Sequence, residues 1–220
     1  MNWPHPDALA ALVSLPAGYH LEPTGRAHVA PLIAALGAWH PRISVGVASC
    51  YLRHDFYRQR VCLDGATDKD VWVARIMFGN EMVGVWSFER EIDSLAIFGR
   101  LLVVAPAHRG AGLSVHTLAG AEHIGRAMGA AFIYALATLQ HTYVQRAFEH
   151  AGYRLLGIFP GYNREEIAPG VVRRVYECVY AKLLVPEDEV HRPEARNLSP
   201  RAKALFELLF SDLSPTGREF

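Results

Sequence analysis

A glycine-rich turn near the middle of the chain has the composition of a phosphate-binding loop. Residues 101–104 are apolar without alternation, as in a strand buried on both faces, and Pro106 ends the pairing because it has no N–H to donate. Gly110 and Gly112 allow a sharp turn and a close approach of the backbone to a ligand. Apolar positions then recur with helical spacing over residues 113–128. The first N–H groups of that helix are therefore available to an anion.

The spacing of the loop distinguishes among phosphate-binding motifs. The chain contains no G-x-x-x-x-G-K-[ST] sequence, and its glycines do not form G-x-G-x-x-G after the first strand. What remains is Arg109-x-x-Gly112-x-Ser114. This pattern resembles the acyl-CoA signature R/Q-x-x-G-x-G/A of the GCN5-related N-acetyltransferase (GNAT) superfamily, with Ser114 where Gly or Ala is usual. The resemblance implies that the pyrophosphate of acyl-CoA binds to Arg109, Gly110, Ala111, Gly112, Leu113 and Ser114.

A second segment also resembles this superfamily. Residues 141–153 are similar to the family pattern N-x-x-A-x-x-x-Y-x-x-x-G-F, with Gly152-Tyr153 in the place of G-F. His141 stands where Asn is frequent, and Phe148 stands where the family often has a tyrosine that protonates the departing CoA thiolate. Phe148 has no proton to give, so Tyr143 and His141 are predicted as substitute acids.

The resemblance further implies a direct attack of an amine on the thioester. Backbone amides of Leu102, Val103 and Val104 would hold the pantetheine and polarise the carbonyl, in the manner of an oxyanion hole. Thr138 and Phe148 are expected beside the cofactor, with Thr138 near the acyl chain.

Carboxylates on the strands are candidates for the general base. Glu89 is the predicted base, and Glu91 and Glu22 are alternatives. All three positions are also typical of solvated charges at strand ends.

The acceptor is expected between an early helical region and a late loop. Tyr51 and His54 are predicted on one wall of this site. Residues 161–170 read as a long loop, in which Glu165 and Glu166 either attract an amine or form a solvated tip.

The order of predicted elements agrees with the motifs. The pattern predicts a strand, two helices, three strands, a helix, a strand, a helix and two strands. The ranges are 19–23, about 28–37, 49–63, 71–78, 82–88, 95–104, 113–128, 132–136, 144–151, 154–159 and 173–184. This is the order of the GNAT fold, an α/β (α+β) architecture whose central mixed, mostly antiparallel sheet is flanked by helices. The resemblance covers roughly residues 18–185, after an N-terminal segment of residues 1–17.

The C-terminal part, residues 186–220, changes in composition. Residues 186–198 are charged and contain proline, as in a linker, and Ser199-Pro200 gives an N-cap and first-turn signal for a helical extension. A stripe at helical spacing follows: Ala202, Leu205, Phe206, Leu209, Phe210 and Leu213. Two arrangements remain open, in which this helix packs on its own domain or crosses to a second copy and forms a homodimer.

Composition limits the classes of function. Half of the 220 residues are apolar, and 22 basic residues balance 22 acidic ones, so no basic field attracts nucleic acid or an anionic membrane. No signal peptide and no membrane-spanning apolar run are evident, and a cytoplasmic protein is expected. The three cysteines lack metal-like spacing, so reduced thiols and no metal site are predicted.

These observations predict an acyl-CoA-dependent N-acyltransferase that transfers acetyl from acetyl-CoA to a primary amine of a small molecule. The contrasting prediction is an acyl-CoA-binding module without catalysis, which the missing tyrosine at Phe148 favours. A third is acetylation of a protein or of aminoacyl-tRNA, and the balanced charge argues against the tRNA version.

Overall fold

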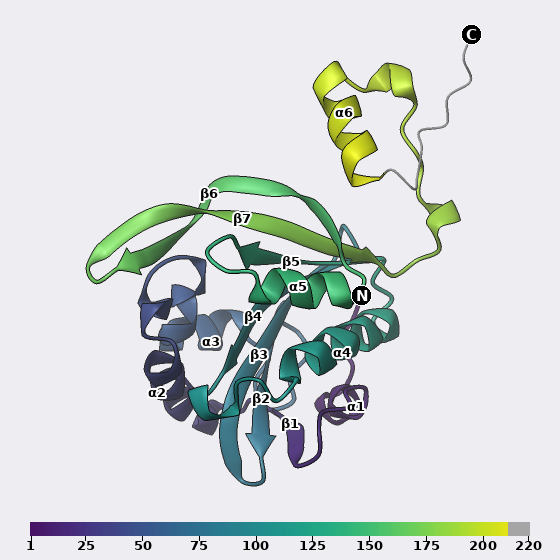
Figure 1. The fold of residues 1–220 in the computed structure, drawn as a ribbon. Helices are drawn as coiled ribbons and strands as arrows, with labels where there is room; N and C mark the ends of the chain where they lie inside the picture. The colour runs from purple at the N-terminus through teal and green to yellow at the C-terminus, as the bar shows by residue number, and fades with distance from the viewer. Residues whose placement is uncertain (211–220) are drawn as a thin grey trace.

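The chain folds around one seven-stranded sheet in a computed structural model that describes residues 1–210 (Figure 1). The strand order is β1-β2-β3-β4-β5-β7-β6. Among the strands of the described residues, β4 and β5 form the one parallel pair, which confirms the predicted mixed, mostly antiparallel sheet. The strands are β1 (Tyr19–Pro23), β2 (Val71–Phe78), β3 (Glu81–Glu91), β4 (Ala96–Val104), β5 (Phe132–Thr138), β6 (Arg154–Ala168) and β7 (Val171–Leu183).

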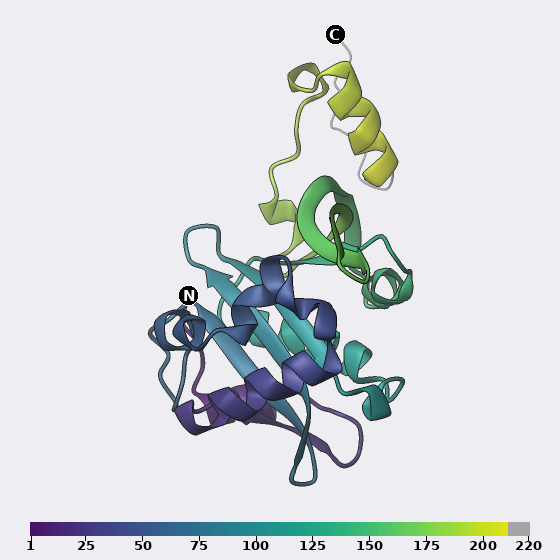
Figure 2. The ribbon, with the colours of Figure 1, turned by 90° about the vertical axis from the view of Figure 1, so that its left-hand side faces the viewer.

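Helices cover both faces of the sheet. One face carries α1 (Pro6–Ala11), α4 (Leu113–Ala127) and α5 (Tyr143–His150), and Figure 2 shows α2 (Val29–Trp39) and α3 (His54–Arg60) over the other. Short 3₁₀ segments connect the elements: η1 (Arg26–His28), η2 (Pro41–Ser44), η3 (Val47–Leu52), η4 (Pro106–His108), η5 (Glu187–Glu189) and η6 (Ala195–Asn197). The sheet is thus the middle of three layers.

Two hydrophobic cores lie on opposite faces of the sheet because side chains alternate along a strand. In β2, Val71 and Val73 pack in the core under α2 and α3, whereas Trp72 and Ala74 pack in the core under α4. The buried Leu9 joins this second core. The N-terminal segment therefore contributes to packing of the main domain.

One predicted element is divided in two, and another is wrong. The helical region predicted over 49–63 is divided at Arg53, whose extended backbone separates η3 from α3. The loop predicted over 161–170 is mostly strand: β6 continues to Ala168 after an irregularity between Phe159 and Asn163. The Pro160-Gly161 pair, with a φ of +68° at Gly161, interrupts the apolar alternation and conceals the strand from a sequence pattern.

The C-terminal helix α6 (Pro200–Leu209) lies outside the layers of the main domain, where it contacts β6 (Figures 1 and 2). Its predicted N-cap is confirmed, since Ser199 Oγ accepts a hydrogen bond from the Ala202 amide at 3.3 Å. Leu205 of its apolar stripe is 50% exposed, whereas Phe206, Leu209 and Phe210 are half-buried, and Leu213 lies outside the described residues. Among the described helices none has the length and apolarity to span a membrane.

Candidate functional site

The predicted phosphate-binding loop lies at the N-terminus of α4. Gly110 and Gly112 have φ angles of +86° and +78°, and a Cβ at either position would meet no atom within 4 Å. Gly112 is the N-cap of α4, and its carbonyl accepts from the amides of Val115 and His116. Within residues 1–210, no backbone hydrogen bond is donated by the amides of residues 110–112. The loop therefore offers unpaired N–H groups beside open space at the positive end of a 15-residue helix.

Arg109 holds this loop in place. Its Nε donates to the Val104 carbonyl at 3.2 Å and its Nη2 donates to the Trp39 carbonyl at 2.9 Å. The guanidinium thus joins the loop to the end of β4 and to the end of α2. Its positive charge remains beside the unpaired amides.

The parallel strands β4 and β5 separate next to the loop. Residues 96–99 of β4 pair with residues 132–135 of β5, and the pairing ends there. In its pairing with β3, β4 has one extra residue, Arg100. A bulge of this kind bends a strand and ends pairing. The Ala105 amide donates to the Val83 carbonyl of β3. Because successive backbone N–H groups of a strand point to opposite sides, the Val103 N–H also points toward β3. Of the three predicted amide donors, Leu102 and Val104 face the gap toward β5, and Val103 does not.

A cavity of about 400 Å³ occupies the gap between these strands and passes through the sheet. On the α4 side its walls include Ser114, Thr117 and Phe148, and on the α3 side they include Arg100 and Tyr134. The cavity therefore extends from Ser114, at the start of α4, to the opposite face of the sheet.

The second predicted motif forms part of this wall. Phe148 is 6% exposed, and its ring stacks on Tyr180 at a centroid distance of 5.3 Å. Tyr143 begins α5, lines the cavity and is 80% exposed, with its ring 5.3 Å from that of His141. Thr138 ends β5, where its Oγ1 accepts from the Gln140 amide. The phenol of Tyr143 is thus accessible at the edge of the cavity.

Glu89 does not stand free on the sheet. One of its oxygens accepts from Arg60 Nη2 at 2.6 Å, and the other accepts from Arg100 Nη1. The Arg100 guanidinium lies 5.8–5.9 Å from the ring centroids of Tyr51, Phe56 and Phe98. Because both oxygens of the predicted base are engaged by guanidinium groups, its evident role is to neutralise Arg100 beside the cavity.

Tyr51, which the sequence predicts on one wall of the acceptor site, is buried and is not among the residues that line the cavity. It is 1% exposed, and its hydroxyl donates to Ser87 Oγ at 2.6 Å and accepts from Arg100 Nε. Burial raises the pKa of Tyr51 to about 12. The segment η3 places this ring against the sheet. Tyr51 therefore acts on the cavity through Arg100, a residue of the cavity wall that donates to its hydroxyl.

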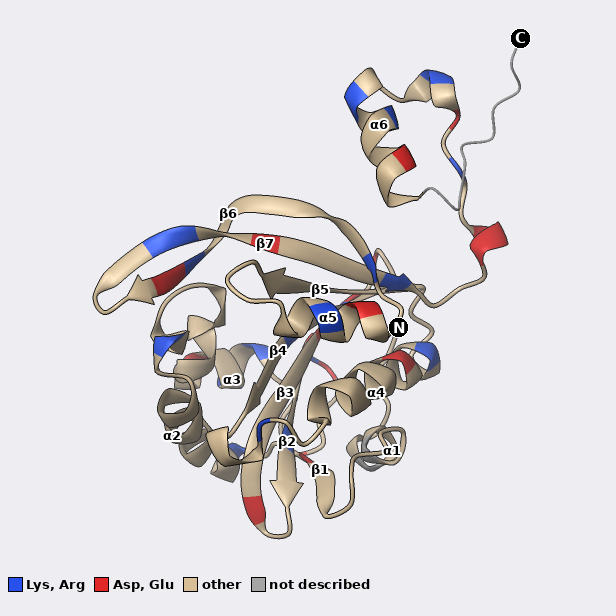
Figure 3. Ribbon diagram, in the orientation of Figure 1, with Lys and Arg blue, Asp and Glu red and all other residues tan. Residues whose placement is uncertain are grey.

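Glu165 and Glu177 of the β6–β7 hairpin lie on the same face of the sheet as Tyr134. Figure 3 shows acidic positions on both arms of the hairpin. Burial raises the pKa of Glu165, while His141 and Arg42 oppose that effect. One oxygen of Glu165 accepts from Gln140 Nε2. Glu177 is 6% exposed, and its Oε1 accepts from Asn163 Nδ2 at 3.2 Å.

The remaining predicted residues lie elsewhere. Glu166 is on the other face of β6 from Glu165, and its Oε1 accepts from the Gly170 amide at 2.6 Å, which closes the hairpin turn. His54 is the exposed first residue of α3. Glu22 pairs with Arg75 at 2.7 Å, and Glu91 accepts from the Tyr134 hydroxyl at 2.6 Å. Of these, only Glu91 is in contact with a residue of the cavity wall.

Sequence reasoning missed Arg100, Tyr134, Asn163 and Glu177. Arg100 and Tyr134 interrupt apolar strand patterns, and a polar group in a buried run is the signal that could have identified them. The same signal marks Glu177, the one acidic residue in the run from Val175 to Ala181. Asn163 carries no comparable mark.

Comparison with known proteins places the fold. No family model matches the sequence, and no curated protein matches it. Among solved structures, RimL, a ribosomal L7/L12 alpha-N-protein acetyltransferase in complex with coenzyme A, is 14% identical with a TM-score of 0.58. The match covers 78% of this chain and 97% of RimL.

Two further solved structures are similar. RimJ of Mycobacterium smegmatis, with a CoA disulfide, is 16% identical over 78% of this chain and 85% of that chain, with a TM-score of 0.57. An IAA acetyltransferase from Bacillus cereus ATCC 14579 is 14% identical over 75% of this chain and 99% of that chain, with a TM-score of 0.55. At these identities the likeness establishes the fold.

Proposed function

Because the chain has the fold of the GNAT acetyltransferases, we propose that it is an acyl-CoA-dependent N-acyltransferase. Acetyl-CoA is the proposed donor, and the primary amine of a small molecule is the proposed acceptor. The observation that carries the proposal is the cavity that runs between β4 and β5 from Ser114, at the start of α4, to the face of the sheet where Tyr134 donates to the Glu91 carboxylate. Such a passage brings a phosphate-bearing donor and an amine together from opposite sides.

The residues along the cavity fit the parts of acyl-CoA. The amides of residues 110–112 and the α4 N-terminus suit the pyrophosphate. The amides of Leu102 and Val104 face the gap, where pantetheine would extend along β4. Apolar side chains such as Ile133 and Phe148 line the middle of the passage and exclude water from the thioester.

In the proposed reaction the amine nitrogen attacks the thioester carbonyl, a C–N bond forms, the C–S bond breaks and CoA leaves as a thiolate. An amide N–H of β4 stabilises the negative charge that develops on the carbonyl oxygen. The attacking nitrogen loses a proton, and the thiolate gains one. Tyr143 remains the proposed acid because its hydroxyl is accessible at the cavity edge, whereas Phe148 has no proton.

A protein N-terminus is the second candidate acceptor. RimL, whose structure is similar, is named for the alpha-N-acetylation of a ribosomal protein. A peptide would need room beside the β6–β7 hairpin, whose arms carry the exposed apolar residues Ile158, Phe159 and Tyr176.

The first experiment is calorimetric titration of the full chain with acetyl-CoA, with ATP and NAD as controls. Saturable binding of acetyl-CoA alone supports the donor site. A panel of small amines and of peptides with free N-termini, followed by thiol release, then separates the two acceptors. Binding without turnover of any amine would support the non-catalytic module, and the absence of acetyl-CoA binding would overturn the proposal.

A further inference from the structure

Arg100 is a largely buried cation in the wall of the cavity. Its side chain is 20% exposed, and it belongs to the extra residue of β4 at the point where β4 and β5 separate. In the described part of the chain, Arg100 is the one cavity-lining residue that carries a charge. A guanidinium group stays protonated in proteins, so this charge is permanent. The cavity therefore offers a ligand a positive charge and no negative one.

The hydrogen bonds of Arg100 leave part of its guanidinium available. Nε donates to the Tyr51 hydroxyl at 3.3 Å, Nη1 donates to Glu89, and Nη2 donates to Cys50 Sγ at 3.8 Å, where sulfur is a weak acceptor. A guanidinium has five N–H groups. Two of those in Arg100, one on each terminal nitrogen, therefore have no acceptor within residues 1–210. A ligand group with two acceptor oxygens would satisfy both.

The charge of Arg100 is only partly compensated. Glu89 divides its two oxygens between Arg100 and Arg60, with 2.6 Å to Arg60 Nη2. Glu91, two residues further along β3, accepts from the Tyr134 hydroxyl instead. One carboxylate thus faces two guanidinium groups, and a single negative charge from a ligand would complete the balance.

A carboxylate has the properties that this position requires. It carries one negative charge, and its two oxygens match the planar fork of a guanidinium. A phosphate monoester carries between one and two charges at neutral pH, more than the uncompensated part of Arg100 balances. The remaining wall of the cavity is mostly apolar and holds no second cation among the described residues. A monoanion is therefore favoured over a dianion.

The position of the guanidinium sets the distance between this carboxylate and the reacting amine. The guanidinium lies over the Phe98 ring and bonds to Glu89, the register partner of Phe98. About three residues of strand, or about 10 Å, separate this level of β4 from Leu102, whose amide faces the gap. A hydrogen bond to the carboxylate and the approach of a nitrogen to a carbonyl carbon take about 3 Å each. A few covalent bonds between amine and carboxylate cover the rest.

We propose that the acceptor is an amino acid whose carboxylate binds to Arg100 while its amine attacks the thioester in the gap between β4 and β5. The inference rests on the proposed function, since it names the class of acceptor for that site. Arg100 contacts the substrate and determines specificity, and Glu89 is a positioning residue that holds the guanidinium. The product is an N-acetylamino acid, and CoA leaves as in the proposed reaction.

The test compares amines of equal carbon number that carry either a carboxylate or a hydroxyl group. Glycine is assayed with acetyl-CoA against ethanolamine, β-alanine against aminopropanol, and γ-aminobutyrate against aminobutanol. The three pairs cover the separations that the structure allows. In the wild type, kcat/KM at the best chain length should be about tenfold or more higher for the carboxylate, because the alcohol loses the charge-assisted hydrogen bonds.

Substitutions of Arg100 should remove this preference. The ratio of the two kcat/KM values within one protein is compared, so that a general loss of activity cancels. Arg100→Gln should bring the ratio close to one, and Arg100→Lys, which keeps the charge without the fork, should give an intermediate ratio.

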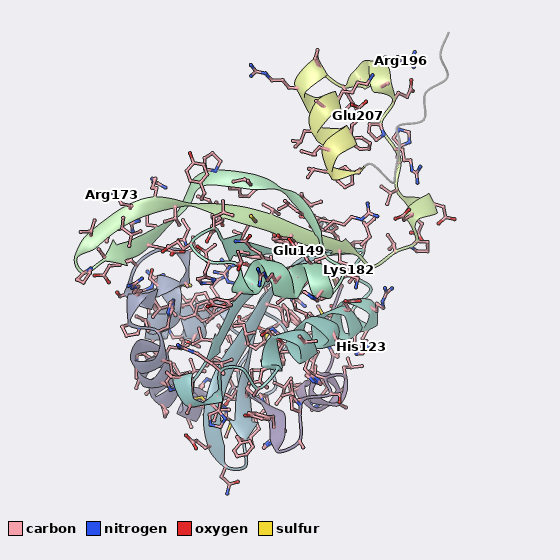
Figure 4. All side chains as sticks on the ribbon, in the orientation of Figure 1. His123, Glu149, Arg173, Lys182, Arg196 and Glu207 are labelled. Atoms are coloured by element: carbon pink, nitrogen blue, oxygen red, sulfur yellow. The ribbon has the colours of Figure 1, made fainter. Side chains whose placement is uncertain are left out.

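Arg196→Gln is the matched control. Arg196 also pairs with a carboxylate, that of Glu194 at 2.7 Å, and Figure 4 places it beside α6, outside the layers of the main domain. This variant also loses one guanidinium group and should keep the wild-type ratio. Calorimetry with γ-aminobutyrate and aminobutanol on the CoA-bound wild type measures the same preference without turnover and without a variant.

The outcomes distinguish this inference from the proposed function. A ratio near one for all three pairs, or the wild-type ratio retained in Arg100→Gln, would overturn the amino acid assignment and leave the N-acyltransferase proposal standing. A higher kcat/KM for phosphoethanolamine than for the carboxylates would also overturn it, in favour of a phosphate group. If acetyl-CoA does not bind to the wild type at all, the proposed function fails first. If only Arg100→Gln fails to bind acetyl-CoA, Arg100→Lys and the wild-type calorimetry decide.

Discussion

The proposed donor side and the proposed acceptor side of the cavity are built from different chemical groups. On the donor side the groups available to a ligand are backbone amides, at Gly110–Gly112 and along β4. On the acceptor side they are side chains from separate elements, such as Glu91 of β3, Tyr134 of β5 and Glu165 of β6. A backbone site depends on a few glycines and a strand, whereas a side-chain site depends on how distant segments meet.

This difference has consequences for substitution. A change in the donor loop acts through backbone conformation, so even an apolar side chain abolishes the site. A change on the acceptor side acts through charge, so an isosteric amide is the informative variant. Substitutions on the two sides should therefore alter different measurable quantities.

The largest effect is expected for Gly112→Val. The φ of +78° at the α4 N-cap is strained for a β-branched residue, so the loop must rearrange and its amides lose their alignment. Loss of several charge-assisted hydrogen bonds should raise the Kd for acetyl-CoA about a hundredfold or more, as measured by calorimetry.

Gly65→Val is the matched control for that variant. Gly65 has a φ of +83° in an exposed turn and, like Gly112, would place a Cβ in open space. Both variants should lose similar stability, and Gly65→Val should bind acetyl-CoA normally. Normal binding by Gly112→Val would show that residues 109–114 form only a turn.

The same contrast explains how far the sequence predicts the molecule. Strands such as Val71–Phe78 and the helix beginning at Leu113 follow from apolar periodicity, and the donor loop follows from glycine spacing, because all of these are local signals. The contact between Asn163 and Glu177 depends on an irregularity in β6, and that between Glu89 and Arg100 depends on a bulge in β4. Neither contact follows from local sequence, and for the same reason the sequence predicts a loop over 161–170 where the structure has a strand.

The second-largest effect is expected from loss of the ion pairs that Glu89 forms with Arg60 and Arg100. Glu89→Gln should lower the free energy of unfolding by about 2 kcal/mol, because Arg100 and Arg60 both lose their counter-charge beside a largely buried group. Urea denaturation measures the change.

Kinetics of the same variant decide whether Glu89 also takes the proton from the amine. A base would show a fall in kcat of about a hundredfold or more and the loss of the acidic limb of the pH profile. An ion-pairing role predicts a smaller fall with the limb retained, and this second result is expected since both oxygens are already engaged.

Tyr143→Phe tests the protonation of the departing CoA thiolate. The departing thiolate is a moderately good leaving group, so loss of the acid should lower kcat by about tenfold rather than abolish turnover. Steady-state thiol release with the alkaline limb of the pH profile is the measurement. An unchanged kcat would mean that the exposed phenol of Tyr143 plays no part in protonation.

The smallest effect is a gain of stability in Glu177→Gln, which depends on pH. Burial raises the pKa of Glu177 above the ordinary 4.5, so the folded wild type holds the proton more tightly than the unfolded chain does. The resulting stabilisation is complete below the ordinary pKa and is lost as the pH rises through the raised one. Glutamine carries no charge at any of these pH values, so the variant should match the wild type at pH 4 and exceed it by about 1 kcal/mol at pH 8. Urea denaturation at both pH values measures this difference. A variant that is less stable at pH 8 would indicate that a cation within the protein already compensates Glu177.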